Sequence, residues 1–295
     1  MLKHMQNTLI KRIDDGDIMG ISIRKLQLLE LEIAKEIKRI CEENQIDYFL
    51  IDGTLLGAIR HKGFIPWDDD MDIGMTTESY NRFLEVAPNQ LDERFFLQTS
   101  SIDKNIGYVF AKVRMKHTHF IEKVTDGLGI QDGIFVDILP YDKADSSMIR
   151  SSHMRKLQLL CKIKMLKAGY RLNNITKKPL NRLVNDILAW IPVSKEKIDS
   201  KIESEIQKGI ISGNEYYIER DGMFKGTYVF RREYVDELID VKFEDTLFKA
   251  PKNYDDFLKS AYGNYLEYPS DEERSVGHSV KGVELERPFE SYFSQ

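Results

Sequence analysis

Carboxylates gather in one short segment of the sequence, DGTLLGAIRHKGFIPWDDDMDIG at residues 52–74. If this segment is an extended strand, Asp68, Asp70 and Asp72 point to one face while Met71 points to the other. Two carboxylates roughly 7 Å apart repel by about 2 kcal/mol at an effective dielectric constant near 20. Mg²⁺ or Mn²⁺ would remove that cost, since these ions take a few carboxylates together with substrate phosphates. The pattern favours a metal site on a strand; a solvated acidic loop is the alternative.

A further aspartate, Asp137, lies in the apolar segment GIFVDILPYD at residues 133–142. An isolated carboxylate is costly to bury in such a strand unless a partner compensates it. A metal shared with the first aspartates would be that partner. A strand-end carboxylate held by a cap or a salt bridge is the alternative.

Several groups near the aspartates could bind an anion. Gly53 and Thr54 lie between an expected strand end and a helix start, so their N–H groups and the helix dipole could cradle a phosphate. Arg60, His61 and Lys62 add positive charge at the far end of that helix. A tight turn followed by a solvated basic helix end explains the same residues without a ligand.

Two more basic residues, Lys112 and Arg114, lie two apart in the expected strand GYVFAKVRM. They could reach the same anion from a neighbouring strand, and an exposed strand face is the alternative. Trp67 could stack on a base, although packing against the core is favoured. His278 lies in a polar segment and could reach the site, although a surface position is favoured.

Aromatic side chains at spacing three follow near the end of the chain. Such faces suit a quaternary ammonium group such as choline. The same spacing lines one side of a helix end, so packing against the core is the favoured interpretation. The residues are Tyr262, Tyr265 and Tyr268.

Hydrophobic periodicity and turn residues predict the elements that position these groups. Residues 22–43 read as an amphipathic helix with Leu26, Leu29 and Ile33 on one stripe and Ser22 as its N-cap. The further expected elements are a strand over 46–52, a helix over 54–62 closed by Gly63, a strand over 70–75, a helix over 77–86, strands over 107–115 and 133–142, the second stopped by Pro140, and two or three helices within 146–191.

The bulk composition excludes several classes of protein. With 42% hydrophobic and 31% charged residues over 295 positions, the chain has an ordinary globular composition. A formal net charge of −5 argues against duplex nucleic acid as the main partner. Cys41 and Cys161 lack zinc-ligand spacing and read as reduced core thiols. No signal peptide or spanning segment is recognised, so we expect a cytoplasmic protein.

The order of these parts resembles the nucleotidyltransferase superfamily, whose catalytic core is similar to that of DNA polymerase β. More closely, the run over residues 52–74 together with VDILPYD resembles the LicD family of phosphocholine and sugar-alcohol-phosphate transferases, to which fukutin and fukutin-related protein are distantly similar. The resemblance extends over most of residues 25–280 but says little about 146–210. It implies an α+β fold with a mixed sheet, flanking helices and an inserted or appended helical region.

Three parts of the chain are expected from this resemblance and from the change in sequence character. Residues 20–145 would form the nucleotidyltransferase-like catalytic core. Residues 146–212 would form the helical insertion. Residues 213–295 would complete the catalytic domain.

The resemblance also implies a chemistry. Family members transfer a phospho-alcohol, typically from CDP-choline, to a hydroxyl of a glycan and release CMP. Asp70 and Asp72 would hold Mg²⁺ or Mn²⁺ on the diphosphate, and Asp137 would complete the metal site. Gly53 and Thr54 match the family's phosphate-binding turn. The implied partners are a CDP-alcohol and a glycan, teichoic-acid precursor or lipid-linked glycan, with no nucleic acid.

Alternatives remain open from the sequence. A nucleotidyltransferase that moves a nucleoside monophosphate from a triphosphate to a small hydroxyl compound would use the same D-x-D motif. A glycan-binding or scaffold protein with an inactive core is a third class. The basic and apolar run from Arg155 to Arg171 suggests peripheral docking on an anionic membrane at its inner face, and a packed helix with its lysines in water is the alternative.

Overall fold

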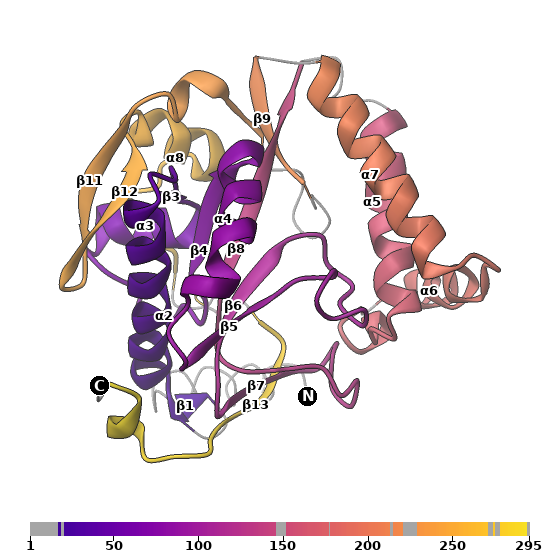
Figure 1. The fold of residues 1–295 in the computed structure, drawn as a ribbon, viewed down its shortest axis with the longest axis horizontal. Coiled ribbons are helices and arrows are strands. Elements are labelled where there is room, and N and C mark those ends of the chain that lie inside the picture. The colour runs from indigo at the N-terminus through magenta and orange to yellow at the C-terminus, as the bar shows by residue number, and fades with distance from the viewer. Residues whose placement is uncertain are drawn as a thin grey trace.

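A computed structural model describes residues 17–18, 21–145, 152–176, 178–212, 215–220, 229–270, 274 and 278–293. Over these residues the fold is a mixed α/β structure in which helices flank a seven-stranded mixed sheet (Figure 1). The described helices are α2 (Ile23–Glu43), α3 (Asp52–Arg60), α4 (Thr77–Gln90), α5 (Ser152–Lys167), α6 (Pro179–Trp190), α7 (Lys195–Ser212) and α8 (Tyr254–Tyr262). No helix in this described part is long and apolar enough to cross a membrane.

The central sheet is organised around its longest strand, β8. Strand β4 pairs with β8 in parallel, while β6 and then β9 pair with it antiparallel along the opposite edge. The strands of this sheet are β3 (Phe49–Leu50), β4 (Asp72–Thr76), β5 (Phe95–Gln98), β6 (Ala111–Met115), β8 (Phe135–Ala144), β9 (Tyr216–Glu219) and β10 (Val229–Arg231).

Among the described residues, three two-stranded sheets accompany the central one, and all are antiparallel. The β11–β12 pair packs beside β3, and the β7–β13 pair joins the middle of the chain to its C-terminal part. These strands are β1 (Asp17–Ile18), β2 (Ile21–Ser22), β7 (Thr118–Glu122), β13 (Val280–Leu285), β11 (Leu238–Phe243) and β12 (Thr246–Pro251).

Helix α2 forms as its sequence predicts. The Ser22 hydroxyl accepts a hydrogen bond from the Lys25 N–H at 3.3 Å, which confirms the expected N-cap. Leu26, Leu29 and Ile33 are completely buried on the face that packs against α4, β6 and β8. The apolar stripe therefore places α2 against the sheet that carries the site.

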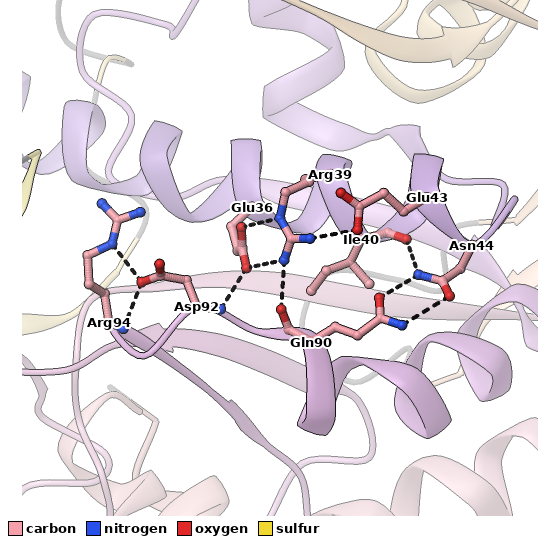
Figure 2. Close-up of polar contacts among 8 residues, drawn as sticks. All are labelled: Glu36, Arg39, Ile40, Glu43, Asn44, Gln90, Asp92 and Arg94. Atoms are coloured by element: carbon pink, nitrogen blue, oxygen red, sulfur yellow. Dashed lines mark hydrogen bonds and ion pairs between the residues drawn. The ribbon is translucent and has the colours of Figure 1, made fainter. Parts of the chain in front are cut away.

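A polar network fastens the C-terminal half of α2 to the end of α4 and the turn that follows it. Figure 2 shows the Arg39 guanidinium bonded to both oxygens of Glu36 and to the Gln90 carbonyl. The side chains of Asn44 and Gln90 exchange hydrogen bonds next to it, at 2.6 and 3.2 Å. These contacts hold the helix layer together.

The prediction that Pro140 stops its strand is wrong, because β8 continues to Ala144. The missing N–H of Pro140 would point away from β4, toward the edge shared by β6 and β9. On that edge the β6 pairing ends at Ile138 and the β9 pairing begins at Tyr141. The proline falls in the gap between the two partners, where no ladder hydrogen bond is lost.

Other differences from the expected elements are local. Helix α3 starts at Asp52 and ends at Arg60, two residues earlier than expected at each end, and α4 runs to Gln90 through Pro88. The expected strand over 46–52 is reduced to β3. The remaining strands, β1, β2, β5, β7 and β9–β13, are not among the expected elements, since their short segments give no clear alternation.

Helices α5 and α7 pack against each other on one side of the molecule, with α6 beside them (Figure 1). They share a small core that includes Met154, Cys161 and Ile198, separate from the main core. Cys41 and Cys161 are both buried, and neither forms a disulfide. The division of the chain into three parts stays a prediction.

Candidate functional site

The sheet brings two of the predicted aspartates together. In the parallel pairing of β4 with β8, Asp72 is the register partner of Asp137. Neighbouring strands lie about 4.8 Å apart, so the two carboxylates start from adjacent positions. The Met71 carbonyl accepts the Asp137 N–H at 3.0 Å, which fixes this register at the start of β4.

The other aspartates reach the same place by a different route from the one predicted. Strand β4 begins at Asp72, so Asp68 and Asp70 precede it, and the prediction that all three share a strand face is wrong. A turn that follows Ile65, closed by the Asp68 N–H to the Ile65 carbonyl at 3.0 Å, leads into this segment. The side chain of Gln27 donates to the Ile65 and Asp68 carbonyls and ties this turn to α2.

His278 completes this side of the cluster from the far end of the sequence. Its backbone N–H lies 3.3 Å from both oxygens of the fully buried Asp69, and its Nδ1 lies 3.7 Å from Asp70 Oδ2. The rings of Phe120 and Phe135 enclose the imidazole, each with its centroid 5.7 Å away. The expected surface position of His278 is therefore wrong, because strand pairing of β13 with β7 carries it inward.

The carboxylates destabilise one another's charged forms. Burial, and then the negative charges of Asp70 and Asp52, raise the pKa of Asp72 well above its usual range. Burial and the charge of Asp70 do the same to the pKa of Asp68. For Asp137 burial raises the pKa while the neighbouring ammonium of Lys112 opposes the rise.

A buried glutamate of α2 belongs to the same cluster. Glu30 is 1% exposed, and among the described residues its Oε2 has no hydrogen-bond partner. Burial, followed by the charges of Asp70 and Asp69, raises the pKa of Glu30 well above its usual range. Sequence reasoning missed this residue because a charge inside an amphipathic helix reads as solvated. Its spacing of four residues from Leu26 and three from Ile33, which places it on the apolar stripe, was the available signal.

Lys112 and Arg114 are both buried, so an exposed strand face does not describe them. The Lys112 ammonium lies 2.8 Å from Asp137 Oδ1 and 3.3 Å from the centroid of the Phe135 ring. The Arg114 guanidinium donates to the Gln98 side chain and to the Gly133 carbonyl. Lys112 therefore faces the acidic cluster, whereas Arg114 is committed to structural contacts.

Gly53 and Thr54 lie in the first turn of α3, directly beside the aspartates. The Thr54 hydroxyl accepts the Asp72 N–H at 2.9 Å, so it positions the start of β4. A Cβ atom at Gly53 would lie 2.6 Å from Asp68 Oδ2, so a side chain at this position would require the Asp68 carboxylate to move. Their predicted role in phosphate binding stays a prediction.

Arg60 and Lys62 lie at the opposite end of α3. Arg60 donates to the carbonyls of Tyr265 and Glu267 at 3.0 and 3.1 Å, and its guanidinium lies 4.8 Å from the centroid of the Tyr268 ring. Lys62 is exposed. The structure therefore uses Arg60 to hold the segment after α8 and does not bring either residue into contact with the aspartates.

The aromatic residues considered from the sequence separate into buried and exposed groups. Tyr265 is buried, with its hydroxyl 2.8 Å from Asp255, whereas Tyr262 and Tyr268 are exposed. Trp67 packs partly against the main core. Packing explains Tyr265 and Trp67, and these residues do not surround the acidic cluster.

The donor set suits a hard divalent cation. Asp69, Asp70 and His278 each offer a ligand atom, and these atoms lie within 4.8 Å of one another. Asp72 and Asp137 add carboxylates beside them, although only Asp70 belongs both to this close set and to the predicted ligands. Several oxygens with one nitrogen fit Mg²⁺ or Mn²⁺, the imidazole favouring Mn²⁺.

Comparison with known proteins adds an independent observation. Residues 45–165 match a family model described as LicD/FKTN/FKRP, nucleotidyltransferase domain. The chain is 29% identical over 265 residues to the lipopolysaccharide cholinephosphotransferase LicD of Haemophilus influenzae, covering 88% of this chain and 96% of that protein. It is 33% identical over 76 residues to the ribitol 5-phosphate transferase FKRP of Homo sapiens, covering 24% of this chain and 15% of that protein. The matched family region contains Asp70, Asp72 and Asp137 but neither Glu30 nor His278.

Proposed function

The chain belongs to the LicD family and is a transferase, and from that premise we propose that it transfers a phospho-alcohol from a CDP-activated donor to a hydroxyl of a glycan. Phosphocholine is the proposed group, because the relative aligned over nearly its whole length is named a lipopolysaccharide cholinephosphotransferase. A cell-surface glycan or a teichoic-acid precursor is the proposed acceptor. We further propose that the sheet around Asp72 and Asp137 is a nucleotidyltransferase-type core.

The observation that carries this proposal is the register of Asp72 against Asp137, with Asp70 and Lys112 beside them. Crowded carboxylates of raised pKa are stabilised when a cation binds among them. Asp70, Asp72 and Asp137 would hold Mg²⁺ or Mn²⁺, with Asp69 and His278 supporting the Asp70 side. When bound, the ion neutralises charge on the diphosphate and aligns it for in-line attack.

The transfer itself needs little covalent chemistry from the protein. The acceptor oxygen forms a bond to the phosphorus that carries the alcohol, and the bond from that phosphorus to CMP breaks. The acceptor proton passes to a carboxylate, and Asp137 is the proposed recipient because Lys112 and the sheet hold it in place. Lys112 would also face the diphosphate from its buried position on β6.

Thermal unfolding tests the proposal with defined ligands. The purified protein is heated with Mn²⁺ or Mg²⁺ in the presence of CDP-choline, CDP-ribitol, CDP-glycerol, CTP or ATP. A ligand at about 100 times its dissociation constant stabilises the native state by about 2.7 kcal/mol. We expect metal-dependent stabilisation by a CDP-alcohol and none in the Asp72→Asn variant.

Two outcomes would contradict the proposal. Stronger stabilisation by a triphosphate, with pyrophosphate released on turnover, would identify a nucleotidyltransferase. An Asp72→Asn variant of undiminished transferase activity would remove the metal site from the mechanism. The cytoplasmic location of the reaction stays a prediction.

A further inference from the structure

Helix α6 presents an apolar face to solvent. Its large apolar side chains recur at intervals of three or four residues and so share one side of the helix. The exposed fractions are 70% for Leu180, 57% for Leu183, 38% for Val184, 59% for Ile187 and 86% for Trp190. We refer to these five residues as the α6 stripe.

The inward side of the same helix carries polar groups next to Leu188, which packs against the small core. Asn185 is buried and donates to the Asn173 side chain at 2.8 Å, and Asn173 in turn donates to Asp186 at 2.8 Å. The Lys167 ammonium donates to the Ala189 carbonyl at 2.8 Å. A helix that only packs on its own domain turns its apolar side inward, so the orientation of α6 is the reverse of that expected for a surface helix.

The surroundings of the stripe are strongly basic. Residues 152–190 contain nine lysines and arginines against one acidic residue, Asp186, although the whole chain carries −5. Inside the bundle Lys156 pairs with Glu205 and Lys164 with Asp199.

Other basic side chains of this region lie in water. Arg155, Lys178 and Arg182 are exposed, so their charge is available to a partner. A negatively charged partner is therefore complementary to this part of the protein.

We propose that the α6 stripe docks on a lipid bilayer surface that contains anionic phospholipid. An apolar stripe, flanking lysines and arginines and a terminal tryptophan are the composition of helices that lie in the membrane interface. The 12 residues of α6 span about 18 Å. This length suits a helix lying on the bilayer with its apolar side submerged.

A groove beside the stripe has the same mixed character. It has a volume of about 470 Å³ and opens between α5 and α6. Leu159 and Ile175 give it apolar walls that are partly exposed, and Lys162 adds a cation. An acyl chain with its phosphate headgroup combines the chemistry that this groove offers.

The docking surface is not the one expected from the sequence. The run from Arg155 to Arg171 is mostly α5, whose Met154, Leu157 and Cys161 are buried in the small core shared with α7. Helix α5 therefore contributes charge, while α6 contributes the apolar contact. This inference concerns where the protein sits and does not depend on which alcohol is transferred.

Vesicle flotation of the full chain tests the proposal. Vesicles of phosphatidylcholine with phosphatidylglycerol should carry the protein, and vesicles of phosphatidylcholine alone should bind it about a hundredfold more weakly, because the exposed Arg155, Lys178 and Arg182 then lose their attraction to an anionic surface. A double variant, Leu183→Asn with Ile187→Asn, should lower partitioning about 100-fold. Leu247→Asn, an equally exposed leucine on β12, is the matched control and should bind as the original protein does.

Tryptophan fluorescence provides a second measurement, since the chain has 2 tryptophans. Addition of anionic vesicles should shift the emission to shorter wavelength, and Trp190→Phe should abolish the shift while Trp67 still reports the fold. Equal flotation of the double variant and the original protein would overturn the proposal. So would self-association through the stripe in sedimentation velocity without vesicle binding, since the occupant would then be a second copy of the chain.

Discussion

Helix α2 buries two glutamates six residues apart, Glu30 and Glu36, and it buries them in opposite ways. Glu36 receives the Arg39 guanidinium on both oxygens, at 2.8 and 2.9 Å, and the Asp92 N–H at 2.8 Å (Figure 2). Glu30 instead lies among Asp68, Asp69 and Asp70, whose charges raise its pKa further after burial has raised it. A single helix thus carries both a compensated and an uncompensated carboxylate.

This difference between the two glutamates distinguishes a region that stabilises the fold from a region arranged to bind a ligand. In the network of Figure 2, each buried charge has its partner within the chain, as stability requires. Within the described part of the chain, Lys112 and His278 form ion pairs with the acidic cluster, which holds Glu30 and the aspartates at positions 52, 68, 69, 70, 72 and 137. An excess of negative charge lowers stability unless a ligand supplies positive charge. The cluster is therefore organised for a bound cation.

The strongest test of this contrast is removal of a carboxylate from each region. Asp72→Asn should reduce transferase activity by about a thousandfold, because one of the proposed charged ligands is lost. Its free energy of unfolding without metal should stay the same or rise, since repulsion within the cluster falls. Initial rates with CDP-choline and urea unfolding in EDTA measure the two effects.

Glu36→Gln is the matched control for that experiment. It weakens a bidentate pair with Arg39 and should lower stability while leaving the rate per folded molecule unchanged. If Asp72→Asn instead lost stability and Glu36→Gln lost activity, the assignment of the two regions would be reversed.

A smaller effect is expected from breaking the network itself. Arg39→Ala leaves Glu36 buried without its guanidinium and removes the donor to the Gln90 carbonyl. Because Arg39 is 40% exposed, water replaces part of the interaction, and we expect a loss of about 1–2 kcal/mol. Lys38→Ala, which breaks an exposed pair with Glu42, should cost less than about 0.5 kcal/mol. Equal losses in the two variants on urea unfolding would show that burial of Glu36 does not matter.

The sequence predicts these two regions unequally. The α2 stripe, its Ser22 cap and the placement of Asp72 and Asp137 on strands follow from local patterns, and the structure has them. Contacts made over long separations do not follow from such patterns. His278 reaches Asp69 across 209 positions through the β7–β13 pairing, which no local periodicity indicates.

Basic residues show the same limit. Arg60, Lys62, Lys112 and Arg114 all carry a charge that could bind phosphate, and the sequence does not distinguish them. The fold directs Lys112 to Asp137 and directs Arg60 to two carbonyls after α8. The sequence shows which residues carry a positive charge, but tertiary packing decides which partner each side chain faces.

Replacement of Glu30 tests how an uncompensated carboxylate in the acidic cluster affects stability. The raised pKa of Glu30 favours the protonated form of this side chain when no metal is bound, and glutamine resembles that form closely. Glu30→Gln should therefore change the free energy of unfolding in EDTA by less than about 0.5 kcal/mol. A loss as large as that of Arg39→Ala would show that Glu30 has a compensating partner after all.

The smallest effect on stability is expected at a solvent-exposed histidine, His119, that pairs with two carboxylates. His119 Nδ1 lies 2.7 Å from Asp132, and its Nε2 lies 3.1 Å from Glu286. The hydrogen bond to Asp132, partly offset by burial, raises the pKa of His119 above 6.5. The pair therefore stabilises the native state fully below the unfolded-state pKa, and this stability is lost as the pH rises through the folded-state value.

Exposure limits the size of that effect to about 0.2–0.5 kcal/mol, because solvent screens both partners. Urea unfolding of the original protein and of His119→Gln between about pH 5.5 and pH 8.5 should converge as the pH rises. If the difference in stability between the two proteins grew with pH, the native state would favour the neutral form of the His119 imidazole. The stabilisation that a carboxylate gains from its partner would then increase with burial. The solvated His119 contributes least, and the half-buried Arg39 contributes more. At the site around Asp72 the largest contribution comes from a bound ligand.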